Sequence, residues 1–266
     1  MRIYILADLE GVGGVVNKTQ TFAGGAAYEK AREWLTREIN AAVQGALAGG
    51  AKEIVVLDGH GANNAVNFLY EDLHPGATYI QGVPWTEYLQ DLDASYSGLF
   101  QIGSHAMAGT QGAVLEHTMY SETWVEMRVN GRPMGEIGLA AACAGHFDVP
   151  FVMVSGDDKA CEEAKAIGPD VECAVVKYGI SRHCARLLPQ PAVLDLITEK
   201  SRLAVAKIPS IRPVKLTSPV VIEVDYVRND TADAIRERDG VERIGPRTVR
   251  FTGANIVQAF NRVLGG

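Results

Sequence analysis

Two carboxylates stand one residue apart at the end of the first apolar stretch of the chain. In the segment RIYILADLEG, Asp8 and Glu10 are followed at once by Gly11. Residues i and i+2 of a strand point to the same face, so the two carboxylates would repel each other unless a cation or a proton lay between them. The pattern therefore indicates a charge partner for Asp8 and Glu10.

Further candidate metal ligands follow the next predicted strands. Asp58 and His60 come at the end of EIVVLD, His105 follows GLFQIG, and Glu136 begins a predicted helix. Ligands of an open parallel sheet bind beyond the carboxyl ends of its strands, so we expect these side chains at one edge of the sheet. Carboxylates and imidazoles together are typical ligands of zinc or manganese, whereas magnesium takes mainly oxygen ligands.

The strands and helices that would position these residues alternate along the chain. Apolar strand patterns cover RIYILAD, EIVVLD, residues 98–103 and residues 150–158, the last leading into a helix near Lys159. Apolar residues at helical spacing predict a helix from residue 28, which ends at Gly49 and Gly50. This order predicts an α/β fold, a mostly parallel sheet with helices on both faces.

A hairpin and a change of pattern complete the predicted organisation. TWVEMRV is followed by the turn Asn130-Gly131, and Pro133 stands where it could start the helix GEIGLAAACAGHF. We interpret this hairpin as a lid or a contact element. A Pro-containing connector at 209–219 then leads to two more strands and a final helix. We therefore predict an α/β catalytic domain with the metal site over residues 1–208 and a small C-terminal α+β unit over 209–266.

The composition restricts the class of protein. A chain of 266 residues with 47% hydrophobic residues can bury one substantial core. A net charge of −7 without a basic stripe argues against a nucleic-acid or an anionic-membrane partner. The N-terminal apolar stretch is interrupted by acids and no stretch approaches a membrane span, so we expect a cytoplasmic protein. Its four cysteines form no CxxC pair and are expected to be buried, reduced thiols.

Eight motifs occur in order along the chain: MRIYILADLEG, VVLDGHGANN, LHPGA, QIGSHAMAG, GAVLEHTMYS, VNGRPMGEIGLAA, DVPFVMVSGDDKACEEA and AVVKYGISR. Together they resemble successive motifs of the zinc D-aminopeptidase family that is encoded in bacterial dipeptide-transport operons. The resemblance extends to about Pro189 of the 266 residues. Ordered agreement of this kind is specific, although any single motif would not be.

The resemblance implies a binuclear zinc site and a peptide-hydrolysing activity. It implies two zinc ions per subunit, short peptide substrates with an N-terminal D-residue, and a homo-oligomer, a decamer of two stacked pentameric rings. The catalytic histidine of the family corresponds to His117, within LEHTM, and Asp8 would bridge the two metals. The implied metal ligands are Asp8, Glu10, His60, His105 and Glu136.

Two departures from the family pattern lie next to these positions. The family usually has serine two residues before the first aspartate, where this chain has Leu6, and serine before the second-motif histidine, where this chain has Gly59. Both changes leave the metal ligands intact. They affect hydrogen bonds around the ligands, and with them the substrate range.

A pair of zinc ions would make hydroxide available near neutral pH and would polarise the scissile carbonyl. The leaving amine must then collect a proton, and His117 is the candidate donor, with a nucleophilic role as the alternative. The group that binds the substrate ammonium is not identified by the sequence. Stereochemical preference depends on pocket shape, which a sequence does not display.

Two alternative functions remain open from the sequence. DLEG and SGDD resemble the acidic motifs of haloacid-dehalogenase-like, magnesium-dependent phosphatases, in which Asp8 would be the nucleophile and no histidine is needed. Asp157 and Asp158 are more simply interpreted as caps of the following helix. The other alternative is a non-catalytic, metal-containing peptide-binding assembly protein, although structural zinc sites commonly include cysteine. We predict a metallo-aminopeptidase.

Overall fold

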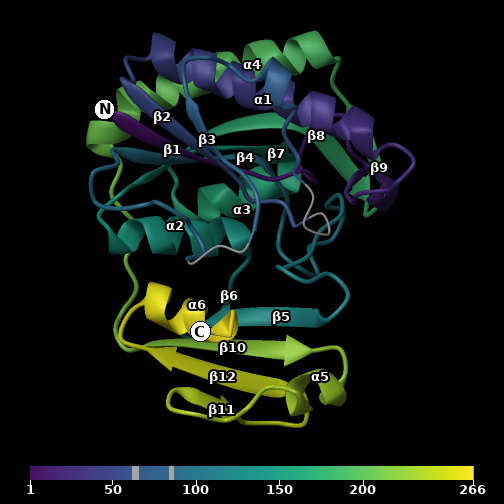
Figure 1. Cartoon of the computed structure of the whole chain (residues 1–266), viewed down its shortest axis with the longest axis vertical. Coiled ribbons are helices and arrows are strands. Elements are labelled where there is room, and N and C mark those ends of the chain that lie inside the picture. The colour runs from purple at the N-terminus through teal and green to yellow at the C-terminus, as the bar shows by residue number, and fades with distance from the viewer. Residues whose placement is uncertain (62–65, 84–86, 266) are drawn as a thin grey trace.

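A computed structural model describes residues 1–61, 66–83 and 87–265 of the chain. Figure 1 shows a large sheet with helices above and below it, and a smaller sheet at the opposite end from α1 and α4. No helix among the described residues is long and apolar enough to cross a membrane.

The large sheet has seven strands and is parallel except at one edge. In spatial order they are β3 (Thr78–Ile80), β2 (Glu53–Asp58), β1 (Arg2–Ala7), β4 (Gly98–Ser104), β7 (Phe151–Asp157), β8 (Glu172–Ser181) and β9 (Cys184–Leu187). Among the described strands of this sheet, only the β8–β9 pair is antiparallel. The four predicted strands are confirmed as β1, β2, β4 and β7, whereas the sequence analysis did not predict β3, β8 and β9.

Two pairs of helices cover the faces of this sheet, as predicted (Figure 1). The helices α1 (Tyr28–Ala48) and α4 (Gln190–Lys207) pack against each other on one face, and α2 (Glu136–His146) and α3 (Asp158–Ile167) lie on the other. Every residue of β4 and β7 is buried. Coverage on both faces explains why these strands are continuous apolar runs rather than alternating ones.

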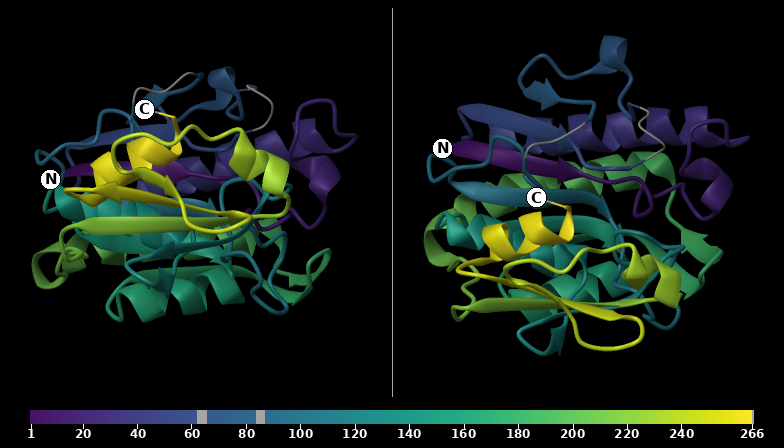
Figure 2. Two further views of the ribbon diagram at one scale, coloured as in Figure 1. Left: turned by 90° about the horizontal axis from the view of Figure 1, so that it is seen from below. Right: turned by 60° about the horizontal axis from the view of Figure 1, so that its bottom comes forward.

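The second sheet is antiparallel, and two of its strands alternate between buried and half-buried residues. Its spatial order is β11 (Val241–Arg243), β12 (Thr248–Gly253), β10 (Val220–Tyr226), β5 (Trp124–Val129) and β6 (Arg132–Pro133). Helix α6 (Ile256–Val263) packs on its inner face and against α2, and α5 (Asn229–Asp233) follows β10. Seen from below in Figure 2, this sheet lies in front of the large one. The predicted C-terminal strands and final helix are confirmed.

The predicted hairpin is an integral part of the second sheet. Strand β5 pairs with β10, so residues 124–133 join strands that lie about a hundred positions later in the chain. The prediction that Pro133 starts a helix is wrong, because Pro133 ends β6 and α2 begins at Glu136 after Gly135. The domain boundary at 208 stays a prediction. One apolar cluster includes both Leu57 of the large sheet and Ile222 of the small one.

Short 3-10 turns and the cysteines complete the description. The turns are η1 (Lys18–Gln20), η2 (Tyr70–Asp72) and η3 (Ile208–Ser210). All four cysteines are free thiols, as expected, but burial is confirmed only for Cys143 and Cys161, since Cys173 is half-buried and Cys184 is exposed.

Candidate metal centre

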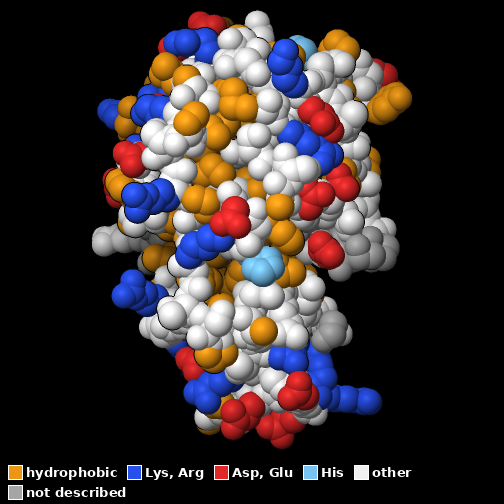
Figure 3. Space-filling view, turned by 90° about the vertical axis from the view of Figure 1, so that its left-hand side faces the viewer, with side chains coloured by type: hydrophobic (Ala, Val, Ile, Leu, Met, Phe, Trp, Pro, Cys, Tyr) orange, Lys and Arg blue, Asp and Glu red, His pale blue; other side chains and the backbone are white. Residues whose placement is uncertain are grey.

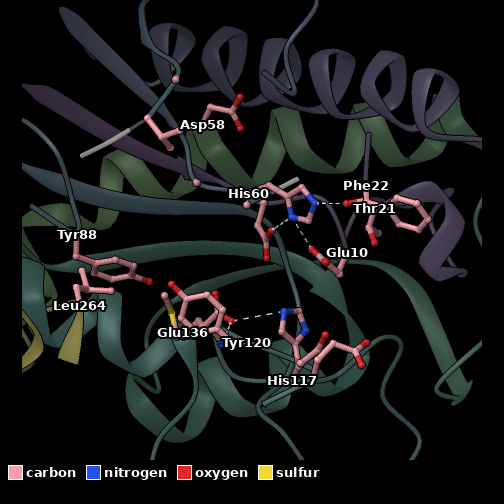
Figure 4. Close-up of a pocket in the computed structure, with 18 of the residues that line it drawn as sticks. Glu10, Thr21, Phe22, Asp58, His60, Tyr88, His117, Tyr120, Glu136 and Leu264 are labelled. Atoms are coloured by element: carbon pink, nitrogen blue, oxygen red, sulfur yellow. Dashed lines mark hydrogen bonds and ion pairs between the residues drawn. The ribbon is translucent and has the colours of Figure 1, made fainter. Parts of the chain in front are cut away.

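The six predicted site residues meet at the carboxyl edge of the large sheet. Their ligating atoms form two groups, each within 4.8 Å: Asp8, Glu10 and His60 in one, and His105, His117 and Glu136 in the other. The first group comes from the ends of β1 and β2. The second comes from the end of β4, the loop after it and the first turn of α2. Figure 4 shows Glu10 and His60 of the first group and His117 and Glu136 of the second around one cavity.

Asp8 lies between the two groups and contacts a histidine of each. Its Oδ1 is 3.0 Å from Nδ1 of His60, and its Oδ2 is 3.3 Å from Nε2 of His105. Glu136 Oε1 is also 3.3 Å from Nε2 of His105. The two carboxylate oxygens of Asp8 therefore contact different groups.

Backbone carbonyls fix the orientation of all three histidine rings. His60 Nε2 is 2.6 Å from the carbonyl of Thr21, His105 Nδ1 is 3.0 Å from that of Ala106, and His117 Nδ1 is 2.8 Å from that of Leu115. A carbonyl only accepts, so these nitrogens carry the hydrogen and the other ring nitrogen of the neutral imidazole has a free lone pair. That lone pair faces the carboxylates. In metal sites, likewise, one ring nitrogen of histidine binds the metal while the other donates a hydrogen bond.

The carboxylates and histidines of the site shift each other's pKa values. Burial by itself lowers the pKa of His60, but Glu10 and Asp8 beside it outweigh burial and raise that pKa well above its ordinary value. Burial by itself raises the pKa of Asp8, but His60 and His105 outweigh burial and bring that pKa below its usual range. Metal ions compete with protons for these imidazoles, so metal binding releases protons and weakens at low pH.

One buried oxygen lacks a hydrogen-bond partner and tests whether a cation fits. Glu10 Oε2 is 3.1 Å from Nδ1 of His60, yet it accepts no hydrogen bond from any residue that the structure describes. A buried carboxylate oxygen without a donor is costly, and a cation would satisfy it. The donor set of carboxylates and imidazoles, without cysteine, fits a zinc site that keeps positions open.

A cavity of about 970 Å³ lies over both groups. Five of the six site residues line it, and its walls extend to Phe22 on one side and to Tyr88 and Leu264 on the other (Figure 4). Leu264 follows α6, so the C-terminal end of the chain forms part of a wall around the metal groups. No sequence pattern predicts this contribution.

Comparisons with known proteins agree with this geometry. The model of the M55 peptidase family, described as D-aminopeptidase, matches residues 1–264. The chain belongs to this M55 family of D-aminopeptidases. A D-aminopeptidase of Bacillus subtilis (strain 168) is 33% identical over 266 residues, covering 99% of this chain and 96% of that protein.

A solved structure of the same family has the same fold. It is the Zn-dependent D-aminopeptidase DppA from Bacillus subtilis, described as a self-compartmentalizing protease. The TM-score is 0.94 at 32% identity, over 100% of this chain and 96% of that one. The predicted family and the enzyme class, a metallo-aminopeptidase, are thereby confirmed. The phosphatase and the non-catalytic alternatives find no support in these matches.

In this M55 chain, Asp58 supports His60 through Asn67 and belongs to neither metal group. Its carboxylate accepts hydrogen bonds from the backbone nitrogen of Asn67 at 2.7 Å and from Nδ2 of Asn67 at 2.8 Å. Asn67 Nδ2 also donates to the carbonyl of His60, and Tyr28 donates to Asn67 Oδ1 at 2.6 Å. Asn67 and Tyr28 were not predicted, because no sequence pattern links them to His60.

The two departures from the family pattern are neighbours in space. A Cβ on Gly59 would lie 2.6 Å from Cδ1 of Leu6 and 2.9 Å from the carbonyl oxygen of Ala7. Leu6 is 8% exposed and packs into the apolar cluster beside β2. Leu6 therefore occupies space that a side chain at position 59 would need.

His117 is held by strained backbone on both sides. Leu115 and Met119 have φ of 53° and 59°, values that cost energy for residues other than glycine. The His117 ring stacks on that of His105 with centroids 3.9 Å apart, and the backbone nitrogen of Met119 donates to Glu136 Oε1 at 2.6 Å. These contacts fix the His117 ring beside His105 and Glu136.

Proposed function

We propose that this chain is a binuclear zinc aminopeptidase that hydrolyses short peptides with an N-terminal D-residue, such as D-Ala-D-Ala. The observation that carries the proposal is the position of Asp8, whose two oxygens contact a histidine of each group. The similar Bacillus subtilis protein is zinc-dependent. Two zinc ions in each subunit would account for both groups.

The ligands divide between the two positions. Asp8, Glu10 and His60 would hold one zinc, and Asp8, His105 and Glu136 the other. When bound, the ions supply Lewis-acid activation of water and of the scissile carbonyl. Because four of the five ligands also line the cavity, positions on the ions remain open toward substrate.

His117 is the proposed proton donor to the leaving amine. Its Nε2 is 3.8 Å from Glu136 Oε1, farther than the 3.3 Å that separates His105 Nε2 from the same oxygen. Among the described carboxylates, Glu136 is the one within ion-pair distance of His117, whereas His105 also contacts Asp8. His117 lines the cavity, and the carbonyl of Leu115 keeps the hydrogen of the neutral ring on Nδ1. Its Nε2 would therefore first take a proton from the attacking water and then pass it to the leaving amine.

The charge of the cavity suits the ammonium end of a peptide. Its described lining carries one cation, Lys18, and these acids: Asp8, Glu10, Asp58, Glu87, Glu122 and Glu136. Two zinc ions would neutralise part of this charge. The remaining negative potential favours a free N-terminal ammonium over a blocked one.

The assembly state is also part of the proposal. We infer a homo-oligomer, a decamer of two pentameric rings with the cavities facing an internal space, because the similar Bacillus subtilis protein is a self-compartmentalizing protease. A cytoplasmic location stays a prediction. Size-exclusion chromatography with light scattering tests the number of subunits, and a stable monomer would contradict the decamer.

Metal analysis paired with activity tests the function. The purified protein should hydrolyse D-Ala-D-Ala faster than L-Ala-L-Ala, lose activity on chelation and regain it with zinc. His117→Ala should abolish turnover and leave zinc content nearly unchanged. Loss of zinc from this variant would instead make His117 a ligand, and turnover that persists would exclude it as the proton donor.

A further inference from the structure

A fully buried lysine lies beneath the loop that carries Glu10. Lys177, on β8, is 0% exposed, and its ammonium donates to the carbonyls of Glu10 at 2.6 Å, Val12 at 2.9 Å and Val15 at 2.6 Å. An ammonium has three donors, and all three are used on one loop. No carboxylate of the described residues lies within ion-pair distance of Lys177, so its direct contacts are with backbone oxygens.

The loop is held between this ammonium and the end of β4. Gly11 donates to the carbonyl of Gly103 at 2.7 Å, and a Cβ on Gly11 would lie 2.0 Å from the carbonyl oxygen of Ser104. The peptide that joins Glu10 to Gly11 is therefore fixed at both ends, its carbonyl by Lys177 and its nitrogen by β4. This fixes the direction in which the Glu10 side chain leaves the backbone.

Two buried carboxylates near Lys177 hold neighbouring parts of the site. Glu38 Oε1 accepts a hydrogen bond from Gly13 at 2.8 Å, and Asp157 accepts one from Val114, three residues before His117, at 2.7 Å. Burial lowers the pKa of Lys177 to about 8, and the negative charge of these two side chains opposes that effect. A buried lysine is expensive unless such partners compensate it. Their presence indicates an arrangement that keeps the charge inside the protein.

We propose that Lys177 is a positioning residue that holds Glu10 in its ligating geometry before any metal binds. The proposal rests on the zinc site inferred above. A protein that relied on the metal to order this loop would spend binding energy on ordering it, whereas a loop already in place keeps that energy for affinity. Residues that orient metal ligands typically change metal affinity by about 10–100-fold.

Lys177→Met tests this, because methionine fills similar space without charge or donors. We expect the zinc dissociation constant, measured by competition with a chelator, to rise about 10–100-fold. Activity should recover toward the wild-type value at saturating zinc. The matched control is Val224→Ala, a truncation of a fully buried residue in the second sheet, which should lower stability and leave zinc affinity unchanged.

Zinc affinity in Lys177→Met equal to wild type would overturn the proposal, as would an equal loss of affinity in Val224→Ala. If the wild-type protein binds zinc but cleaves no D-peptide, the proposed function fails while the affinity comparison still decides the role of Lys177.

Hydrogen exchange on the wild-type chain covers the case in which Lys177→Met does not fold. The amides of Gly11, Gly13 and Val15 donate to Gly103, Glu38 and Val12. In the chelated protein their protection should match that of the zinc-loaded protein. Exchange that accelerates in this loop on chelation, while the amides of β4 stay protected, would show that the metal orders the loop and would overturn the proposal.

Discussion

Charged side chains that support the site on the large sheet and its helices are buried, whereas the charged pairs of the small sheet are partly exposed. Lys177, Asp157 and Glu38 are at most 2% exposed, and each holds backbone groups of a loop near the metal groups. On the small sheet, the side chains of Arg128 and Arg250 are 23% and 39% exposed. Figure 3 shows charged side chains gathered at its end of the molecule.

The difference follows from how each sheet is covered. Helices on both faces of the large sheet leave its loops at the carboxyl edge with backbone groups that need buried partners. The small sheet has one open face, where charges pair across strands as Arg128–Glu223–Arg250 do. Removing a buried charge from the large sheet therefore leaves its partners without a hydrogen bond. On the small sheet, water can take the place of a removed side chain.

The largest effect is expected at Asp8, the proposed bridging carboxylate. Asp8→Asn removes the charge that contacts both groups, so zinc dissociation constants should rise more than about 100-fold and activity should be lost. Elemental analysis after dialysis measures this. Asp225→Asn, which removes an acid from the small sheet, should keep wild-type zinc content. Equal zinc loss in both variants would remove the contrast between the sheets.

A contact between β1 and the His60 loop should show the next largest effect. Gly59→Ala forces a Cβ against Leu6 and Ala7 and should lower the free energy of unfolding by about 1–3 kcal/mol. Leu6→Ala in the same background should cost less than it does alone, because it frees that space. Denaturant unfolding of the four proteins measures the coupling, and strictly additive changes would show that the two positions do not compensate.

The pH dependence of stability tests the buried carboxylate of α1. Burial raises the pKa of Glu38 from 4.5 to about 7. Between these values the native state holds a proton that the unfolded state has lost, so stability falls as pH rises from 4.5 to 7.

Glu38→Gln replaces this carboxyl group with an amide that does not ionise. Relative to wild type, the metal-free variant should therefore become more stable by about 1–3 kcal/mol between pH 5 and pH 8. Glu163, whose pKa is also raised to about 7 by burial, is present in both proteins and cancels in the difference. A constant difference across this range would contradict the assignment.

The smallest effect is expected on the small sheet. Arg128 pairs with Asp225 at 2.6 Å and with Glu223 at 3.4 Å, all partly in solvent. Arg128→Gln should lower the free energy of unfolding by about 1 kcal/mol or less, and by less still at high salt. Zinc affinity should not change. If Arg128→Gln lowers the free energy of unfolding as much as Gly59→Ala does, exposure would not explain the difference between the two sheets.

Local patterns in the sequence determined the main elements and most of the candidate site. Apolar runs predicted β1, β2, β4 and β7, and helical spacing that ends at Gly49 predicted α1. Parallel strands end at one edge, so acids and histidines after those strands had to meet there. The role of His117 came only from the resemblance to the family, since its loop has no strand-end pattern.

Tertiary structure alone decided what supports the site. Lys177 interrupts the apolar run of β8 and would be expected at the surface, but carbonyls more than 160 positions earlier in the chain make its burial possible. The same holds for the contact of Leu6 with Gly59, the pairing of β5 with β10, and the place of Leu264 beside the cavity. Periodicity reports only which residues neighbour each other within one helix or strand. Contacts between distant segments depend on how the whole chain packs.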